Sequence, residues 1–160
     1  MRTAIGRAAE YSTVYLRLAL GSAFLSSVAD RFGLWGATGA KNVAWGNFDN
    51  FLAYTAMLNP YAPSSLIPAL GWIVTLAEAT LGLLLILGFR IRETVALSGA
   101  LLLVFAIGMT IGLGIKAPLD YSVFAASAGA FLLAAHGKSP FSIDALRGRD
   151  HLVPSESCVT

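Results

Sequence analysis

The sequence predicts an all-α membrane protein, a bundle of four transmembrane helices with an amphipathic interfacial helix between the first and second spans. Two features of composition support this class. Of the 160 residues, 56% are hydrophobic and only 12% are charged, whereas about a quarter of a soluble domain is charged. The third observation is the stretch 66–88, because roughly 20 apolar residues are enough to cross a bilayer as a helix. We therefore expect one membrane domain over residues 1–138 and a polar cytoplasmic tail over residues 139–160.

The first span is predicted over residues 12–34. It is the most polar of the four, with Arg17 near its entry and Arg31 at its exit. Four residues spaced four apart share one face, which is better buried against protein than exposed to lipid. These four are Leu18, Ser22, Ser26 and Asp30.

The long connection over residues 35–65 is predicted to hold a short amphipathic helix at the membrane interface. Its apolar residues recur at helical spacing, and an Asn-Pro dipeptide ends the run. Trp45, Phe48 and Phe51 follow one another every three residues. Two roles fit these aromatic side chains: an anchor among lipid headgroups, and a lid or docking surface that binds a partner.

The second span, residues 66–88, carries one ionisable side chain, Glu78, near its middle. A charge at the bilayer centre costs about 3 kcal/mol on insertion scales, so this carboxyl group is expected to face protein and to share a proton or meet a basic partner. Glu78 lies on one stripe with Gly71, Thr75 and Gly82. We therefore place it on the small-residue face that packs against other helices.

Arg17 is the basic residue that we consider as the partner of Glu78. It lies about six residues from the centre of the first span, or about 9 Å in depth at 1.5 Å per residue. Two long side chains close such a gap if their helices are neighbours, and Arg17 can equally extend to the cytoplasmic interface. Glu78 and Arg17 are therefore the candidate catalytic residues, with a structural role in fixing helix register as the alternative.

The third span is predicted to run to about residue 115 and the fourth over residues 119–136. Gly108 and Gly112 have the spacing of close helix contacts. The fourth span is rich in Ala, Ser and Gly, so we expect it to be central to the packing. Stop signals follow residue 136.

Basic residues predict the orientation of the bundle, because cytoplasmic loops carry an excess of Lys and Arg. Seven fall on one predicted side and three on the other. The seven are Arg2, Arg7, Arg90, Arg92, Lys138, Arg147 and Arg149, and the three are Arg31, Lys41 and Lys116. We therefore expect both termini in the cytoplasm. The formal net charge of +2, with basic residues spread along the chain, does not favour a nucleic-acid partner.

The sequence offers little to hold a resident cofactor. Haem ligation inside the bundle needs two histidines at membrane depth, whereas His136 ends the fourth span and His151 lies in the tail. Cys158 is the single cysteine, so one chain cannot build a thiolate cluster. We expect no metal and no cofactor within the chain, and consider a bound quinone or lipid in a hydrophobic pocket beside Glu78.

The first two spans share a residue pattern with a known family. Arg17 is followed by Leu-Gly, Phe-Leu and the basic Arg31, and Glu78 precedes a second Leu-Gly pair. Over residues 15–135 this pattern resembles the DoxX/DoxD-like membrane proteins. The chain departs from the family late in the first span, where it has Val28 and Arg31 in place of the frequent Gly and Lys.

The resemblance implies a small multi-pass protein of the bacterial inner membrane. Some members of the family are associated with quinone-linked thiosulfate oxidation, and others with thiol or oxidative-stress systems. The expected function is that of an accessory or anchoring subunit of a respiratory or quinone-linked redox complex, with the lipid bilayer and other membrane or redox subunits as partners. The alternative is a stand-alone enzyme or carrier that acts on a quinone or another hydrophobic substrate through Glu78. As an enzyme it would be a quinone-linked oxidoreductase component.

Overall fold

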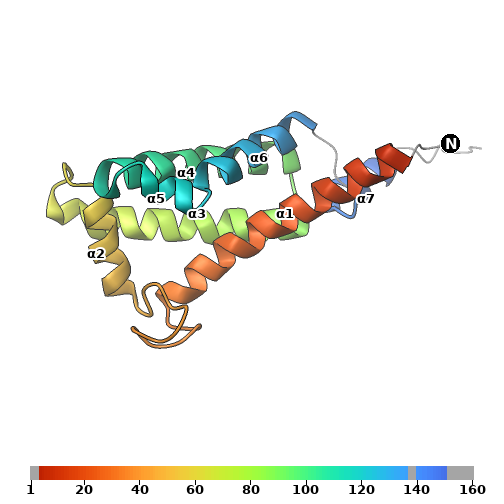
Figure 1. Ribbon diagram of the computed structural model, residues 1–160. Helices are drawn as coiled ribbons and strands as arrows, with labels where there is room; N and C mark the ends of the chain where they lie inside the picture. The colour runs from red at the N-terminus through yellow and green to blue at the C-terminus, as the bar shows by residue number, and fades with distance from the viewer. Residues whose placement is uncertain (1–3, 137–139, 151–160) are drawn as a thin grey trace, which may run out of the picture.

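The computed structural model describes residues 4–136 and 140–150, and all regular secondary structure in these residues is helical. In chain order the elements are α1 (Ala4–Arg31), α2 (Phe48–Leu58), the 3-10 helix η1 (Ser64–Leu66), α3 (Ile67–Leu87), α4 (Ile91–Leu113), α5 (Lys116–Asp120), α6 (Val123–His136) and α7 (Ile143–Asp150). In Figure 1, α2 lies across one end of the bundle and α7 lies at the other. We call these the α2 end and the α7 end. Arg2, Lys138, His151 and Cys158 lie outside the described residues.

Three stretches are long and apolar enough to cross a membrane: Gly6–Arg31, Ser64–Leu87 and Ile91–Leu113. They correspond to the first three predicted spans. The first begins earlier than predicted, because α1 already starts at Ala4. The chain is therefore a helical protein with three helices suited to a bilayer.

The predicted fourth span is not confirmed. Residues 119–136 are divided between α5 and α6, and Ser122 between them has a φ of 55°. Because a non-glycine residue adopts this left-handed conformation at a cost, it interrupts the helix. With 14 residues, α6 is about 21 Å long, shorter than the roughly 30 Å hydrocarbon core of a bilayer.

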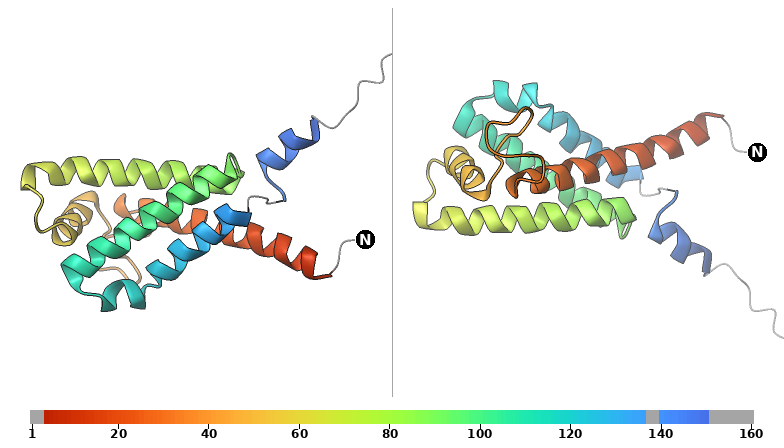
Figure 2. Two further views of the ribbon diagram at one scale, coloured as in Figure 1. Left: turned by 90° about the horizontal axis from the view of Figure 1, so that it is seen from above. Right: turned by 90° about the horizontal axis from the view of Figure 1, so that it is seen from below.

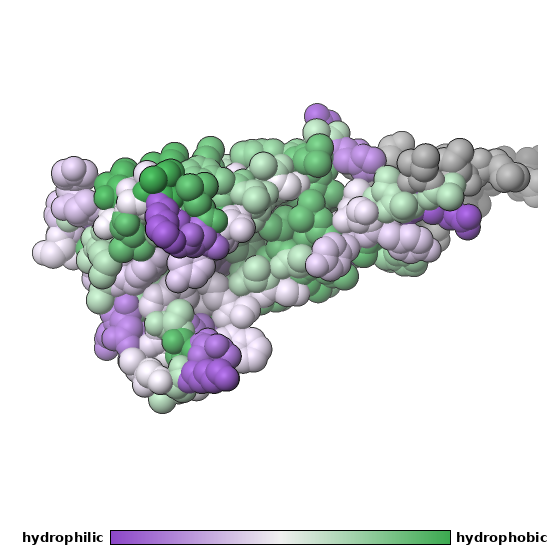
Figure 3. All heavy atoms as spheres, viewed as in Figure 1, coloured by the Kyte–Doolittle hydropathy of each residue, from purple (hydrophilic) through white to green (hydrophobic). Residues whose placement is uncertain are grey.

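The core lies where α1, α3, α4 and α6 meet. The closest neighbours are α1 with α3 and α4 with α6, and the two views of Figure 2 show these pairs side by side. The buried core residues are Leu20, Phe24, Leu81, Leu85, Ile91, Val95, Ala130 and Leu133. Figure 3 shows apolar side chains over much of the outer surface, with hydrophilic residues gathered at the two ends. An apolar outer face is what a bilayer requires of a helical bundle.

The small-residue stripe predicted on α3 is confirmed. Gly71, Thr75, Glu78 and Gly82 are all buried. A Cβ atom added at Gly82 would lie 2.9 Å from Leu25 Cγ of α1, which is closer than real Cβ contacts. Glycine at this position therefore lets α1 pack directly on α3.

The polar face predicted on α1 is only partly correct. Asp30 is buried, but Leu18 and Ser22 are exposed. A serine can donate its hydroxyl to a carbonyl of its own helix, so it does not require burial against another helix. The buried face of α1 is instead formed by residues Thr13, Arg17, Leu20, Phe24 and Arg31.

Of the two glycines predicted to make a close helix contact, Gly112 makes one, and its partner is α2. A Cβ atom added at Gly112 would collide with the carbonyl oxygen of Met57 and lie 2.8 Å from Leu58 Cα. At Gly108 the nearest atom would be 3.7 Å away, in ordinary contact. The carboxyl end of α2 therefore rests on the backbone of α4 at Gly112.

The described part of the tail folds back onto the α7 end. The Asp144 carboxylate accepts hydrogen bonds from the backbone N–H groups of Arg90 (2.9 Å) and Ile91 (2.8 Å). The Asp144 N–H donates to the carbonyl of Gly88 at 3.2 Å. Helix α4 has no side-chain cap from its own Arg90, so Asp144 supplies the acceptors that its first turn needs.

We expect Asp144→Ala to weaken the start of α4 by about 1 kcal/mol, the usual loss when a capping side chain is removed. Amide hydrogen exchange at residues 90–93 should then become about fivefold faster, while exchange in the middle of α3 stays unchanged. Asp120→Ala, which removes an exposed carboxylate at the α2 end, is the matched control. Equal exchange in wild type and Asp144→Ala would show that the tail does not cap α4.

Candidate functional site

A buried ion pair joins the end of α1 to the middle of α3. The Arg31 guanidinium donates through Nη2 to Glu78 Oε2, and the exposed fractions of the two side chains are 2% and 3%. Arg31 also donates through Nη1 to Thr75 Oγ1 at 2.8 Å and through Nη2 to Ser27 Oγ at 3.2 Å. The polar centre predicted around Glu78 is therefore present, with Arg31 as its cation.

Of the two alternatives considered for Arg17, the pair with Glu78 does not form. Arg17 Nη2 donates to the carbonyl of Phe141 at 2.8 Å, and Arg17 Nη1 lies next to Gly88 at the α7 end. Arg17 is 14 residues from Arg31, about 21 Å along α1. Since α1 and α3 pack with opposite directions, Arg17 meets the end of α3 and Arg31 meets its middle.

The sequence contained a signal for the correct partner. Ser27 and Arg31 are four residues apart, so they share one face of α1. A side chain on a helix also leans toward the amino end, which carries the guanidinium of Arg31 back from the helix end into the bundle. Arg31 was instead counted among the basic residues of the outer side, because it lies at the exit of the first predicted span.

Two aromatic side chains cover the ion pair. The Arg31 guanidinium carbon lies 3.8 Å from the ring centre of Phe51 and 5.4 Å from that of Trp45. The two rings contact each other edge to face, with centres 5.2 Å apart. We call Trp45 and Phe51 the aromatic lid. Stacking of a guanidinium on aromatic rings is attractive and strongest where water is excluded, so the lid stabilises the buried charge of Arg31.

The predicted aromatic residues have unequal positions. Phe51 points inward and is buried, and Trp45 lies before the first residue of α2. Phe48 is half-buried and stacks on Trp72 of α3, with ring centres 4.6 Å apart, and on Phe32, 5.9 Å away. The binding of a partner by these residues remains a prediction, and Phe51, which is 5% exposed, has little surface to offer it.

Tyr54 extends this aromatic layer along α2. Its ring centre lies 5.8 Å from that of Trp45. Burial, together with the nearby phenol of Tyr121, raises the pKa of Tyr54, so the hydroxyl stays neutral at physiological pH. The aromatic side chains next to Arg31 are therefore all uncharged.

Asp30, the neighbour of Arg31, holds the lid in position. Its Oδ2 atom accepts hydrogen bonds from the backbone N–H groups of Ala44 and Trp45, both at 3.0 Å. The carbonyl of Trp45 accepts further hydrogen bonds from Thr38 Oγ1 and Asn50 Nδ2, each at 2.9 Å. The connection before α2 is therefore fixed to the end of α1.

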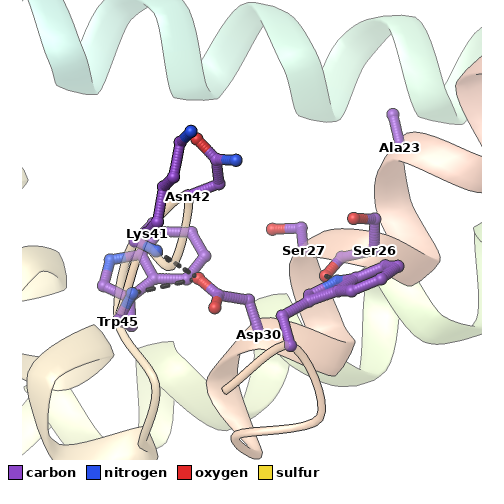
Figure 4. Close-up of a pocket in the computed structure, with 9 residues that line it drawn as sticks. Ala23, Ser26, Ser27, Asp30, Lys41, Asn42 and Trp45 are labelled. Atoms are coloured by element: carbon purple, nitrogen blue, oxygen red, sulfur yellow. Dashed lines mark hydrogen bonds between the residues drawn. The ribbon is translucent and has the colours of Figure 1, made fainter. Parts of the chain in front are cut away.

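A groove of about 680 Å³ lies beside the ion pair. It is formed by α1 and the connection that follows it, and its lining residues are Ala23, Ser26, Ser27, Asp30, Trp35, Lys41, Asn42, Ala44 and Trp45. In Figure 4, Ser27 and Asp30 extend from α1 toward the segment that carries Lys41, Asn42 and Trp45. The sequence did not indicate this groove, because it depends on how the connection folds.

In the described part of the chain, no group of three or more His, Cys, Asp or Glu side chains is arranged to hold a metal ion. Glu78, the predicted proton-active residue, is hydrogen-bonded to Arg31 beneath the aromatic lid. Comparison of the chain with protein families, characterised proteins and solved structures finds no match.

Proposed function

We propose that this protein is an accessory or anchoring subunit of a membrane redox complex, and that it works by binding rather than by catalysis. The redox assignment rests on the resemblance of the first two spans to DoxX/DoxD-like proteins. The membrane assignment is supported by three helices with the length and composition of spans.

The non-catalytic role is supported mainly by the burial and pairing of Glu78. Its carboxylate is engaged by Arg31 and is 3% exposed, and the ring of Phe51 lies 3.8 Å from the guanidinium carbon of that arginine. A group that transfers protons to a substrate has to come within hydrogen-bond reach of it. Glu78 is enclosed by protein, which favours a structural role over the alternative of a carrier or enzyme acting through this residue.

We also propose the bacterial inner membrane as the location, with both termini in the cytoplasm, because α5 and α6 return the chain to the end at which α1 begins (Figure 1). Arg31 is buried in the ion pair, so it does not count among the charges that face the aqueous side. Lys41 and Lys116 then remain at the α2 end against the seven basic residues predicted for the other side. The excess of positive charge on the cytoplasmic side is thereby larger than predicted.

The surface proposed to bind a partner lies at the α2 end. Trp35 and Tyr61 present exposed aromatic rings there, with exposed fractions of 61% and 90%. Trp45 and Phe48 are half-buried at the same end. Exposed aromatic residues are typical anchors of protein interfaces.

Co-purification of the tagged full chain in a mild detergent tests the proposal. A stable partner that contains haem, flavin or metal is expected, and Trp35→Ala with Tyr61→Ala should reduce its recovery about tenfold or more, as loss of interface anchors does. The matched control is Tyr11→Ala, because Tyr11 is an exposed aromatic residue in the first half of α1, away from the α2 end. If the chain purifies alone and retains a quinone, the accessory role is wrong and the carrier alternative is favoured.

A further inference from the structure

The groove beside the aromatic lid has a fixed shape. Trp35 Nε1 donates to the carbonyl of Ser26 at 3.1 Å, and this bond ties one wall of the groove to α1. The opposite wall is held by the two backbone hydrogen bonds that Asp30 Oδ2 accepts from Ala44 and Trp45.

One charged atom in the groove wall has no hydrogen-bond partner among the described residues. The Asp30 side chain is 6% exposed, and its Oδ1 atom is buried without a donor. A buried carboxylate oxygen without a donor is costly, so a ligand that supplies an N–H or O–H group here would be held firmly. Because Oδ1 is almost completely covered, an entering group reaches it only if part of the groove wall moves.

The second charge of the groove is positive. Lys41 lines the groove and is exposed, whereas the Arg31 charge is neutralised by Glu78. The groove therefore offers one carboxylate and one ammonium group on neighbouring walls. Such a pair is complementary to a ligand that carries one positive and one negative charge of its own.

The position of the groove connects it to the bilayer. Ala23 and Ser26 belong to the apolar stretch Gly6–Arg31, and Ala19 and Ser22, which precede them on α1, are exposed. Two tryptophans line the groove mouth, as they do at membrane interfaces. An acyl chain can thus lie along α1 while its headgroup occupies the groove.

From these observations we propose that the groove binds a bilayer phospholipid with a primary-amine headgroup. The ammonium group donates to Asp30 Oδ1, the phosphate lies against Lys41, and the glycerol region packs beside Trp35. A phosphatidylcholine headgroup has no N–H to donate to Asp30, and phosphatidylglycerol has no positive charge.

Native mass spectrometry of the full chain tests this proposal, after purification from bilayers that contain phosphatidylethanolamine, phosphatidylcholine and phosphatidylglycerol in equal amounts. Phosphatidylethanolamine should be retained about tenfold more than phosphatidylcholine, the size expected for one charge-assisted hydrogen bond. Asp30→Asn keeps an oxygen that can accept from Ala44 and Trp45 but removes the charge, so it should abolish this preference. Lys41→Gln should lower retention of both lipids several-fold, and Lys116→Gln, an exposed lysine at the same end, should change neither.

Several results would overturn the proposal. Equal retention of the two zwitterionic lipids, or an unchanged preference in Asp30→Asn, would remove the role of the carboxylate. A preference for phosphatidylglycerol that only Lys41→Gln abolishes would identify an anion site instead. If soluble glycerophosphoethanolamine binds as tightly as phosphatidylethanolamine, the natural ligand is a soluble compound with this headgroup and not a bilayer lipid. If Asp30→Asn does not fold, mono- and dimethylated phosphatidylethanolamine decide the question with wild-type protein, because both keep an N–H and should be retained far better than the trimethylated lipid.

Discussion

Arg31→Leu is expected to lower the free energy of unfolding in detergent by about 3–5 kcal/mol, the usual loss when one partner of a buried ion pair is removed. The substitution leaves the Glu78 carboxylate buried at 3% exposure with its cation gone. It also removes the hydrogen bonds that Arg31 gives to Thr75 and Ser27. Urea or thermal unfolding followed by circular dichroism measures the change.

Replacing both charges is expected to recover most of this loss. In Arg31→Leu with Glu78→Leu no charge remains buried, and buried pairs replaced by apolar residues often give near-neutral stability. Arg90→Leu is the matched control, because Arg90 pairs with Glu93 at the surface, where an ion pair contributes at most about 1 kcal/mol. A double variant as unstable as the sum of the two single variants would argue against coupling between Arg31 and Glu78.

Gly112→Ala is expected to lower stability by about 1–3 kcal/mol, the cost of overpacking a close contact. The added methyl group meets the backbone of Met57 and Leu58, and backbone cannot move aside as a flexible side chain does. The carboxyl half of α2 should therefore separate from α4, with faster hydrogen exchange at residues 55–58.

Gly108→Ala is the control for this substitution. It lies one turn away on the same helix, and its Cβ atom would have ordinary contacts of 3.7 Å or more. Alanine raises helix propensity equally at both sites. The difference in stability between the two variants therefore measures the contact of Gly112 with α2. Equal stability of the two variants would mean that α2 does not rest on α4.

Much of the fold was predictable because it follows from local patterns. The apolar stretches around Glu78 and Gly108 have the length of spans, and the Asn-Pro pair at residue 59 ends α2 as expected. The fourth span was not predictable in the same way. Whether an apolar run is interrupted depends on a single backbone conformation, here that of Ser122, and hydropathy does not report it.

Of the buried ion pair, only the acidic residue, Glu78, could be predicted from the sequence. Helical periodicity placed Glu78 on a buried stripe, but it gives no information about how far one helix is shifted along another. Arg17 was therefore considered as the cation, and Arg31 was not. The role of Asp30 depends on a connection with positive φ at Gly33, Gly36 and Gly46. Glycine reaches such angles readily, yet the path of the chain between them follows from tertiary contacts.

The separation of Arg31 and Glu78 in the chain has a consequence for biosynthesis. The two residues are 47 positions apart, so the ribosome delivers the first helix to the membrane before the counter-charge has been made. Until Glu78 arrives, the guanidinium at the end of α1 is held most favourably at the aqueous boundary, where water solvates it. Burial of Arg31 as it is seen in the folded protein therefore requires α3, which carries the counter-charge.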